Sequence, residues 1–199
     1  MNRNQSTIFT DKQQDSLSQA IAPEMTELVK KVRGAVANAG DWEQAARLVA
    51  KELKGHLPPP DVLTAQQRLG DPDHYISYPL HIEPNGNFSI VALVWRPGQE
   101  TPIHDHVTWC VFGVIQGVEY EELFDHDEKN ACLIKTGVSR NTTGTVNQVA
   151  PPGDIHRVRN SGNSVAISIH IYGTDVSRIG SSVRRCYNLP VHNVSSARV

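Results

Sequence analysis

The N-terminal third of the chain repeats apolar residues with the period of an amphipathic helix. Between residues 23 and 39 they recur at spacings of three and four, and Gly40 follows as a stop signal. Asp41 is a good N-cap for a second helix that runs to about Leu53, where a glycine and three consecutive prolines soon follow. We therefore expect residues 1–70 to form an N-terminal helical region.

After this region the pattern changes to short segments rich in β-branched and aromatic residues. Glycine and proline turns separate the segments, and Pro-Asn-Gly-Asn at 84–87 is a strong hairpin signal. Many short strands with such turns predict a mainly β unit over residues 71–199, either a sandwich or a small barrel. The expected strands are 75–82, 88–95, 108–116, 118–124, 131–136, 145–150, 156–159 and 165–172.

Composition excludes several classes of protein. Lys and Arg total 19 and Asp and Glu total 21, so the formal net charge of −2 gives no reason to expect nucleic acid or an anionic membrane as partner. No apolar run approaches the roughly 18–20 residues that span a bilayer. The polar start lacks the apolar core of a secretory signal, so we expect a cytoplasmic protein. Three cysteines without a CxxC spacing indicate neither a disulfide framework nor a zinc ribbon.

Three of the nine histidines are notable for their spacing. A single residue separates His104 from His106, so on a strand both side chains point to the same face. His156 follows a Pro-Pro-Gly turn farther along the chain. Clustered imidazoles are costly to bury unless a partner satisfies them, and a metal ion does so. We interpret the three as a metal site, with buried metal-free histidines as the alternative.

The two histidine segments resemble the two sequence motifs of the cupin family. The matching residues are Gly98, His104, His106 and Gly117 in the first motif, and Pro151, Gly153, His156 and Asn160 in the second. The resemblance implies a single cupin (jelly-roll) β-barrel with a C-terminal extension over residues 71–199, beside the N-terminal helical region over residues 1–70.

Most cupins carry a glutamate ligand four residues after the second histidine, where this chain has Cys110. Two alternatives follow. Cys110 is a fourth, soft ligand of a closed site, or the metal has three neutral protein ligands. An Fe(II) ion with three neutral ligands keeps open positions and a net charge of about +2, which suits an anionic thiolate together with dioxygen.

A strictly alternating strand lies downstream of the second motif. Ser168, His170 and Tyr172 share one face, and three isoleucines share the other. If the polar face points inward, we expect a hydrogen-bonded relay, because a buried polar triad without partners costs several kcal/mol. The alternative is a polar face in solvent with the isoleucines in the core, and periodicity alone does not choose between them.

A cupin with three histidines, no glutamate ligand and a downstream Ser-x-His-x-Tyr resembles the thiol dioxygenases, which include cysteine dioxygenase and 3-mercaptopropionate dioxygenase. The resemblance covers roughly residues 75–190. It implies Fe(II) as cofactor, a small thiol and O2 as partners, and a sulfinate product. It also implies that the iron ligands are His104, His106 and His156, and that Ser168, His170 and Tyr172 form the family's catalytic triad beside the iron.

The resemblance also bears on Cys110. Some members of the family have a cysteine at this position and join it to the triad tyrosine through a thioether. Cys110 therefore either forms a crosslink with Tyr172 or is a small buried cysteine that merely packs.

A carboxylate on the substrate needs a cation, and the planar fork of arginine suits it. The early strand on which mammalian-type cysteine dioxygenases place that arginine has none here. In the 3-mercaptopropionate enzymes the arginine follows the triad tyrosine instead. Arg185 is therefore the first choice, with Arg184 and Arg178 as further candidates. The alternative is that these arginines are only solvated.

The expected function is O2-dependent oxidation of a small carboxylate-bearing thiol, with 3-mercaptopropionate preferred. The alternatives are cysteine, which would give cysteine sulfinate, and mercaptosuccinate. Two more distant possibilities are another metal-cupin chemistry, such as an isomerase or a zinc enzyme, and a ligand-binding cupin without activity. Whether the chain forms a homo-oligomer is left open.

Overall fold

The computed structural model describes residues 23–193, so residues 1–22 of the predicted helical region lie outside it. Two helices come first, α1 (Pro23–Ala37) and α2 (Trp42–Gly55), as the apolar spacing predicts. The Asp41 carboxylate caps α2 by accepting a hydrogen bond from the backbone N–H of Gln44 at 2.7 Å. Two 3₁₀ turns, η2 (Pro60–Val62) and η3 (Gln67–Leu69), lead from α2 to the strands.

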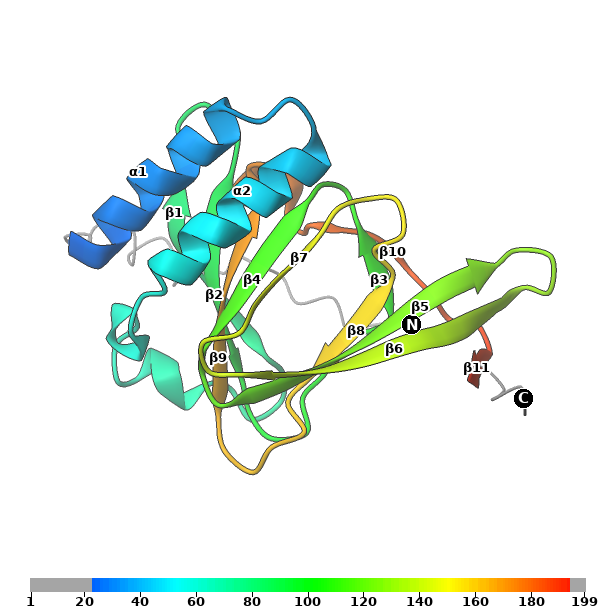
Figure 1. The fold of residues 1–199 in the computed structure, drawn as a ribbon. Helices are drawn as coiled ribbons and strands as arrows, with labels where there is room; N and C mark the ends of the chain where they lie inside the picture. Colours follow the sequence, from blue (N-terminus) through cyan, green and yellow to red (C-terminus); the bar gives the residue numbers. More distant parts are fainter. Residues whose placement is uncertain (1–22, 194–199) are drawn as a thin grey trace.

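The strands form two sheets that face each other (Figure 1). One sheet has the order β1-β2-β9-β4-β7 and the other the order β10-β3-β8-β5-β6-β11. Every pairing is antiparallel except that of β11 with β6. The strands of the first sheet are β1 (Ile76–Ile82), β2 (Ser89–Trp95), β9 (Ala166–Tyr172), β4 (Cys110–Gln116) and β7 (Val146–Val149). Those of the second are β10 (Val183–Cys186), β3 (His104–His106), β8 (His156–Arg159), β5 (Val118–Asp127), β6 (Cys132–Thr142) and β11 (Val191–Asn193).

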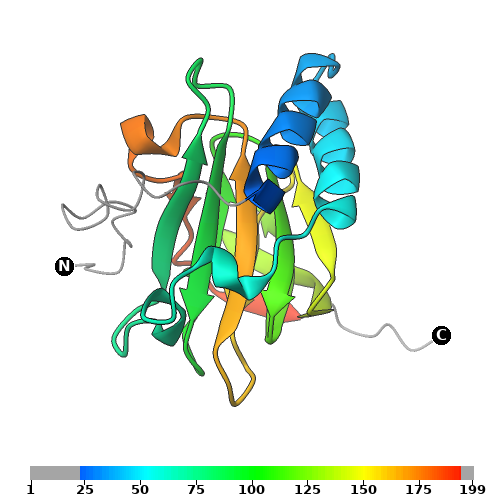
Figure 2. The ribbon, with the colours of Figure 1, turned by 90° about the vertical axis from the view of Figure 1, so that its left-hand side faces the viewer.

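The two helices cover the outer face of the five-stranded sheet (Figure 2). Ile167, Ile169 and Ile171 of β9 are fully buried in one apolar cluster with Val49 and Leu53 of α2. The other face of β9 turns toward the second sheet, so every residue of this strand is buried. The alternative of a solvent-exposed polar face on β9 is therefore wrong: the helices bury one face of the strand and the barrel interior buries the other.

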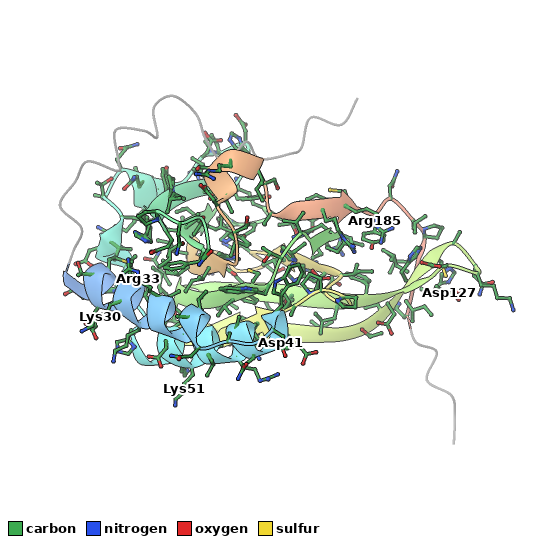
Figure 3. All side chains as sticks on the ribbon, turned by 90° about the horizontal axis from the view of Figure 1, so that it is seen from above. Lys30, Arg33, Asp41, Lys51, Asp127 and Arg185 are labelled. Atoms are coloured by element: carbon green, nitrogen blue, oxygen red, sulfur yellow. The ribbon has the colours of Figure 1, made fainter. Side chains whose placement is uncertain are left out.

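An ion pair fastens α1 to the end of β1. Arg33, labelled in Figure 3, donates to both carboxylate oxygens of the buried Glu83, at 2.9 and 3.0 Å. His81 lies 2.9 Å from the same carboxylate. These contacts hold the pKa of Glu83 below its usual value, chiefly through the hydrogen bond from Arg33. The helical layer is thus attached by a charged contact as well as by apolar packing.

The C-terminal part of the chain contains elements that the sequence pattern did not predict. A short helix, α3 (Val176–Ile179), follows β9, and β10 then returns to pair with β3. Earlier in the chain, strand β6 is much longer than the expected segment 131–136. These segments are exposed or half-exposed along much of their length, so they lack the apolar signal of a buried strand, and their conformation depends on pairing with a distant strand. None of the described helices has the length and apolar character needed to cross a membrane.

The packing of α2 gives a testable prediction. Leu53→Ala removes a fully buried side chain and should lower the free energy of unfolding by about 2–5 kcal/mol. Lys51→Ala, on the exposed side of the same helix, should change it by less than about 0.5 kcal/mol. Urea denaturation followed by circular dichroism measures both values. Equal effects of the two substitutions would contradict the described docking of α2.

Candidate metal centre

The three histidines of the two motifs meet inside the barrel. His104 and His106 lie on β3, and His156 begins β8 directly opposite His104 in the sheet. The ring centroids are 4.7 to 4.9 Å apart, and one nitrogen from each ring lies within 4.8 Å of the others. All three side chains are buried. The alternation of β3 therefore brings His104 and His106 to one face, as their spacing predicts.

Each imidazole has a hydrogen-bond acceptor on its Nδ1 atom. His104 donates to the Pro102 carbonyl at 2.9 Å, His106 to Asp154 Oδ2 at 3.0 Å, and His156 to Glu121 Oε1 at 2.7 Å. These bonds fix the ring orientations and place the proton of each ring on Nδ1. The lone pair of each Nε2 atom is then available to bind a metal ion. Metal-ligating histidines are held in this way.

The environment keeps the imidazoles of His104 and His106 neutral. Burial lowers the pKa of His104 well below its usual value, and the neighbouring His156 and His106 add to the effect. Burial likewise lowers the pKa of His106, although the hydrogen bond to Asp154 opposes this change. A neutral imidazole has a lone pair to give, so protons do not compete with a metal ion near neutral pH.

The donor set fits a divalent transition metal. Among the described residues, the histidines His104, His106 and His156 form the group of close-lying ligand residues, and it includes neither a carboxylate nor Cys110. Three imidazoles suit Fe(II), Zn(II) and similar ions and leave coordination positions for other ligands. The interpretation of Cys110 as a fourth ligand is therefore not supported by this structure.

A hydrogen-bonded chain runs along β9 toward the histidines. Ser168 Oγ lies 3.0 Å from His170 Nε2, and Tyr172 Oη lies 3.3 Å from His170 Nδ1. The indole N–H of Trp95 donates to Ser168 Oγ at 3.3 Å. Burial and the nearby His156 and His106 lower the pKa of His170 to about 3, so this ring is neutral. The inward relay expected from the alternation of β9 is present.

Cys110 belongs to the same interior surface. It lies directly opposite Tyr172 in the pairing of β4 with β9, and its Sγ atom is 3.9 Å from His170 Nδ1. Burial raises the pKa of the Cys110 thiol well above its usual value, and the charges of Glu121 and Asp154 raise it further. The pKa of the Tyr172 phenol is also raised, first by burial. Both groups are therefore protonated in this environment.

A small cavity of about 50 Å³ opens onto the three histidines. His170 and Tyr172 form part of its wall, and β1, β2 and the segment before β10 complete it. Besides the histidines and the indole of Trp95, the polar side chains that line the cavity carry hydroxyls, and no Lys, Arg, Asp or Glu is among the described residues of its wall. The hydroxyl residues are Tyr75, Ser77, Thr101, Tyr172, Ser181 and Ser182.

The arginines expected to bind a substrate carboxylate lie elsewhere. Arg184 and Arg185 are on β10, on the side of the molecule away from the helices (Figure 3), and both pair with Asp105. Asp105 points to the opposite face of β3 from His104 and His106. Arg178, the third candidate, pairs with Asp175 at 3.0 Å. The anchoring role predicted for these arginines is therefore not supported by the positions of their side chains.

Sequence reasoning missed the acidic residues around the histidines. Glu121 and Asp154 hold His156 and His106, yet neither belongs to the motif positions that drew attention to the site. One available signal was the pair Glu119 and Glu121, two acidic residues on the same face of a predicted strand. Ser181 and Ser182 of the cavity wall had no comparable signal, because their position depends on how β10 returns to β3.

The hydrogen bond from His156 gives a second prediction. Glu121→Gln weakens the acceptor on Nδ1, so the affinity of the full chain for Co(II), a probe of the three-histidine site, should fall about 10–100-fold. Glu122→Gln is the matched control, because Glu122 binds Lys135 and Arg157 instead of a histidine and should leave the affinity unchanged. Competition with a chelator measures both. A loss of affinity in the control alone would contradict this assignment.

Known proteins with similar sequences share the region around the histidines. Cysteine dioxygenase type 1 of Rattus norvegicus is 37% identical over 94 residues, which cover 44% of this chain and 46% of that protein. The protein of the same name from Danio rerio is 33% identical over 97 residues, or 45% and 47% of the two chains. The chain thus matches slightly less than half the length of these curated relatives.

Solved structures give a weaker likeness. A conserved protein of Klebsiella pneumoniae with a double-stranded β-helix domain superposes with a TM-score of 0.43 at 19% identity, over 53% of this chain and 81% of that one. A cupin superfamily protein of Desulfitobacterium hafniense superposes with a TM-score of 0.42 at 14% identity, over 58% and 86%.

The family model described as cysteine dioxygenase type I matches residues 69–184, which is more than half of the chain. The matched region runs from before β1 into β10 and contains the three histidines, Cys110 and the polar face of β9. It includes the whole five-stranded sheet and most of the six-stranded sheet, and the predicted mainly β cupin fold with N-terminal helices is confirmed. The chain belongs to the cysteine dioxygenase type I family.

Proposed function

We propose that this protein is an O2-dependent, non-heme Fe(II) thiol dioxygenase that converts a small carboxylate-bearing thiol, preferably 3-mercaptopropionate, to its sulfinate. The observation that carries the proposal is the group of three buried histidines beside the chain of Tyr172, His170 and Ser168. The membership of the chain in the cysteine dioxygenase type I family supports it.

In this proposal Nε2 of His104, His106 and His156 holds the iron. When bound, Fe(II) would supply open coordination positions for a thiolate and for O2. Overall, a thiolate and O2 give a sulfinate: two S–O bonds form, the O–O bond breaks, and sulfur supplies all the electrons. The reaction therefore needs no external reductant.

The residues of the chain orient the reactants. Tyr172 lies in the cavity wall with its hydroxyl held at 3.3 Å from His170, so it can donate or accept a hydrogen bond beside the histidines. Its raised pKa keeps it a phenol at neutral pH. Apolar side chains that line the cavity, among them Leu93, Val158 and Val183, limit the access of water.

The charge of the cavity wall supports the preferred substrate. Cysteine carries an ammonium group, yet the described residues of the wall include no carboxylate to pair with it. Mercaptosuccinate carries a second carboxylate, and the wall offers no Lys or Arg for it. A thiol with one carboxylate needs only the positive metal centre and hydroxyl donors such as those of Ser181 and Ser182. Cysteine and mercaptosuccinate remain the alternative substrates.

Oxygen consumption by the iron-loaded full chain tests the proposal. We expect uptake with 3-mercaptopropionate and a kcat/KM at least about tenfold lower with cysteine or mercaptosuccinate, since an unpaired charge costs more than about 1.4 kcal/mol. His106→Ala should abolish uptake, whereas His126→Ala, a histidine outside the cavity wall, should retain it. Zinc or nickel in the purified protein without thiol-dependent uptake would favour a different metal-cupin chemistry.

The position of Cys110 gives a further prediction, that it forms a thioether with a ring carbon of Tyr172. Cys110 and Tyr172 are paired directly between β4 and β9, so their side chains lie next to each other on the same face of the sheet. The bond removes one hydrogen from the thiol and one from the ring, with O2 as oxidant, so the intact protein becomes lighter by two hydrogen atoms. Mass spectrometry after aerobic turnover measures this change, and Cys110→Ser should not show it. An unmodified wild-type mass means that Cys110 only packs.

A further inference from the structure

A buried carboxyl group lies beyond the chain of Ser168, His170 and Tyr172, and the proposed function does not use it. Glu119 is 0% exposed. It lies on β5 in the six-stranded sheet, two residues before Glu121, and the alternation of the strand turns both side chains into the barrel. Glu121 holds His156, whereas neither carboxylate oxygen of Glu119 has a hydrogen-bond partner within 3.5 Å among the described residues.

The polar groups that act on Glu119 are the Ser168 hydroxyl and the Trp95 indole. Their interaction with the carboxyl lowers its pKa, but burial and the neighbouring charge of Glu121 raise it more, to about 7. Among the described residues, no cation acts on the charged form of Glu119, and the residue directly opposite on β6 is the neutral Asn141. The environment therefore favours a carboxylic acid over a carboxylate.

The hydrogen-bonding capacity of Ser168 links Glu119 to the rest of the chain. A serine hydroxyl donates one hydrogen bond and accepts two. Ser168 Oγ already accepts one from Trp95, and His170 Nε2 lies 3.0 Å away. One donation and one acceptance of the Ser168 hydroxyl therefore remain. His170 takes one of them, and the other is open to the carboxyl of Glu119, which makes no hydrogen bond among the described residues.

Two arrangements satisfy this count. If Glu119 donates to Ser168, then Ser168 donates to His170 Nε2, His170 carries its proton on Nδ1, and that N–H donates to Tyr172 Oη. The Tyr172 hydroxyl is then free to donate toward the three histidines. If Glu119 is a carboxylate, it accepts a hydrogen bond from Ser168. His170 then carries its proton on Nε2 and donates to Ser168, and the Tyr172 hydroxyl donates to His170 Nδ1.

We propose that Glu119 is a positioning residue: as a neutral acid it donates to Ser168, selects the Nδ1–H tautomer of His170, and thereby directs the Tyr172 hydroxyl into the cavity. It acts through Ser168 and touches neither metal nor substrate. The tautomer is a property of the protein alone, and only the kinetic consequence rests on the proposed function.

Nitrogen-15 NMR of the full chain labelled at histidine tests the proposal, because the two ring nitrogens of a neutral imidazole have different shifts in its two tautomers. The protein is studied metal-free in mildly acidic buffer, and His170→Asn identifies the His170 signals. We expect His170 in the Nδ1–H form in the wild type. In Glu119→Leu the fraction of this form should fall at least twofold. An Nε2–H form in the wild type, or an unchanged tautomer in Glu119→Leu, would overturn the proposal.

Conservative and control variants separate positioning from packing. Glu119→Gln keeps an N–H donor and should retain the wild-type tautomer of His170. A change of the His170 tautomer in Glu119→Gln would count against the donor role of Glu119. Asn141→Leu alters the position opposite Glu119 and should leave the tautomer unchanged, because Asn141 bonds to Asn147 and not to Ser168. If Glu119→Leu fails to fold, Glu119→Asp replaces it, since one fewer methylene withdraws the acid from Ser168.

Kinetics provide the second readout. Glu119→Leu should lower kcat for thiol-dependent oxygen uptake about tenfold and leave KM within twofold. Glu119→Leu should have no further effect in a Ser168→Ala background, because the hydroxyl that transmits its influence is absent. Additive effects of the two substitutions would overturn the proposal. Absence of uptake in the wild type would refute the proposed function, while the tautomer measurement would still decide the position of Glu119.

Discussion

The packing of three imidazole rings within 5 Å of one another inside a barrel is the constraint on which the rest of the site depends. Burial of neutral imidazole rings costs free energy unless their N–H groups donate hydrogen bonds and their nitrogen lone pairs bind a partner. The structure meets the first need with a carbonyl and two buried carboxylates, and a bound metal ion would meet the second. The acidic residues of the barrel interior follow from this requirement, because they orient the rings that share it.

The two faces of strand β3 carry side chains with different roles. His104 and His106 face the cavity, and Asp105 between them faces the other way, where Arg184, Arg185 and Tyr187 contact it. The arginines of β10 therefore compensate a buried charge behind the histidines. This arrangement leaves the described residues of the cavity wall free of arginine, so a bound metal would be the main positive centre there. The composition of this wall is the reason why we propose a substrate with a single negative group besides its thiolate.

Strand β9 is buried on both faces for two different reasons. Its isoleucines fill the space under the helices, and its polar residues form a hydrogen-bonded chain in the barrel interior that runs toward the three histidines. A polar strand face inside a barrel is stable only when each group has a partner, so the partners reach beyond the three residues of the motif. Trp95 is one such partner, and we place Glu119 as another.

The sequence alone determined the elements whose signal is local. Apolar spacing predicted both helices, and runs of β-branched and aromatic residues between turn signals predicted most strands. Two short motifs identified the three histidines. Each of these features depends on neighbours a few residues apart. It could not choose the inward face of β9, since both faces are buried and only the docking of α1 and α2 distinguishes them. It also could not place the arginines or the acidic partners of the histidines. Those contacts join residues more than thirty positions apart, and their geometry exists only once β10 pairs with β3 and β5 pairs with β8.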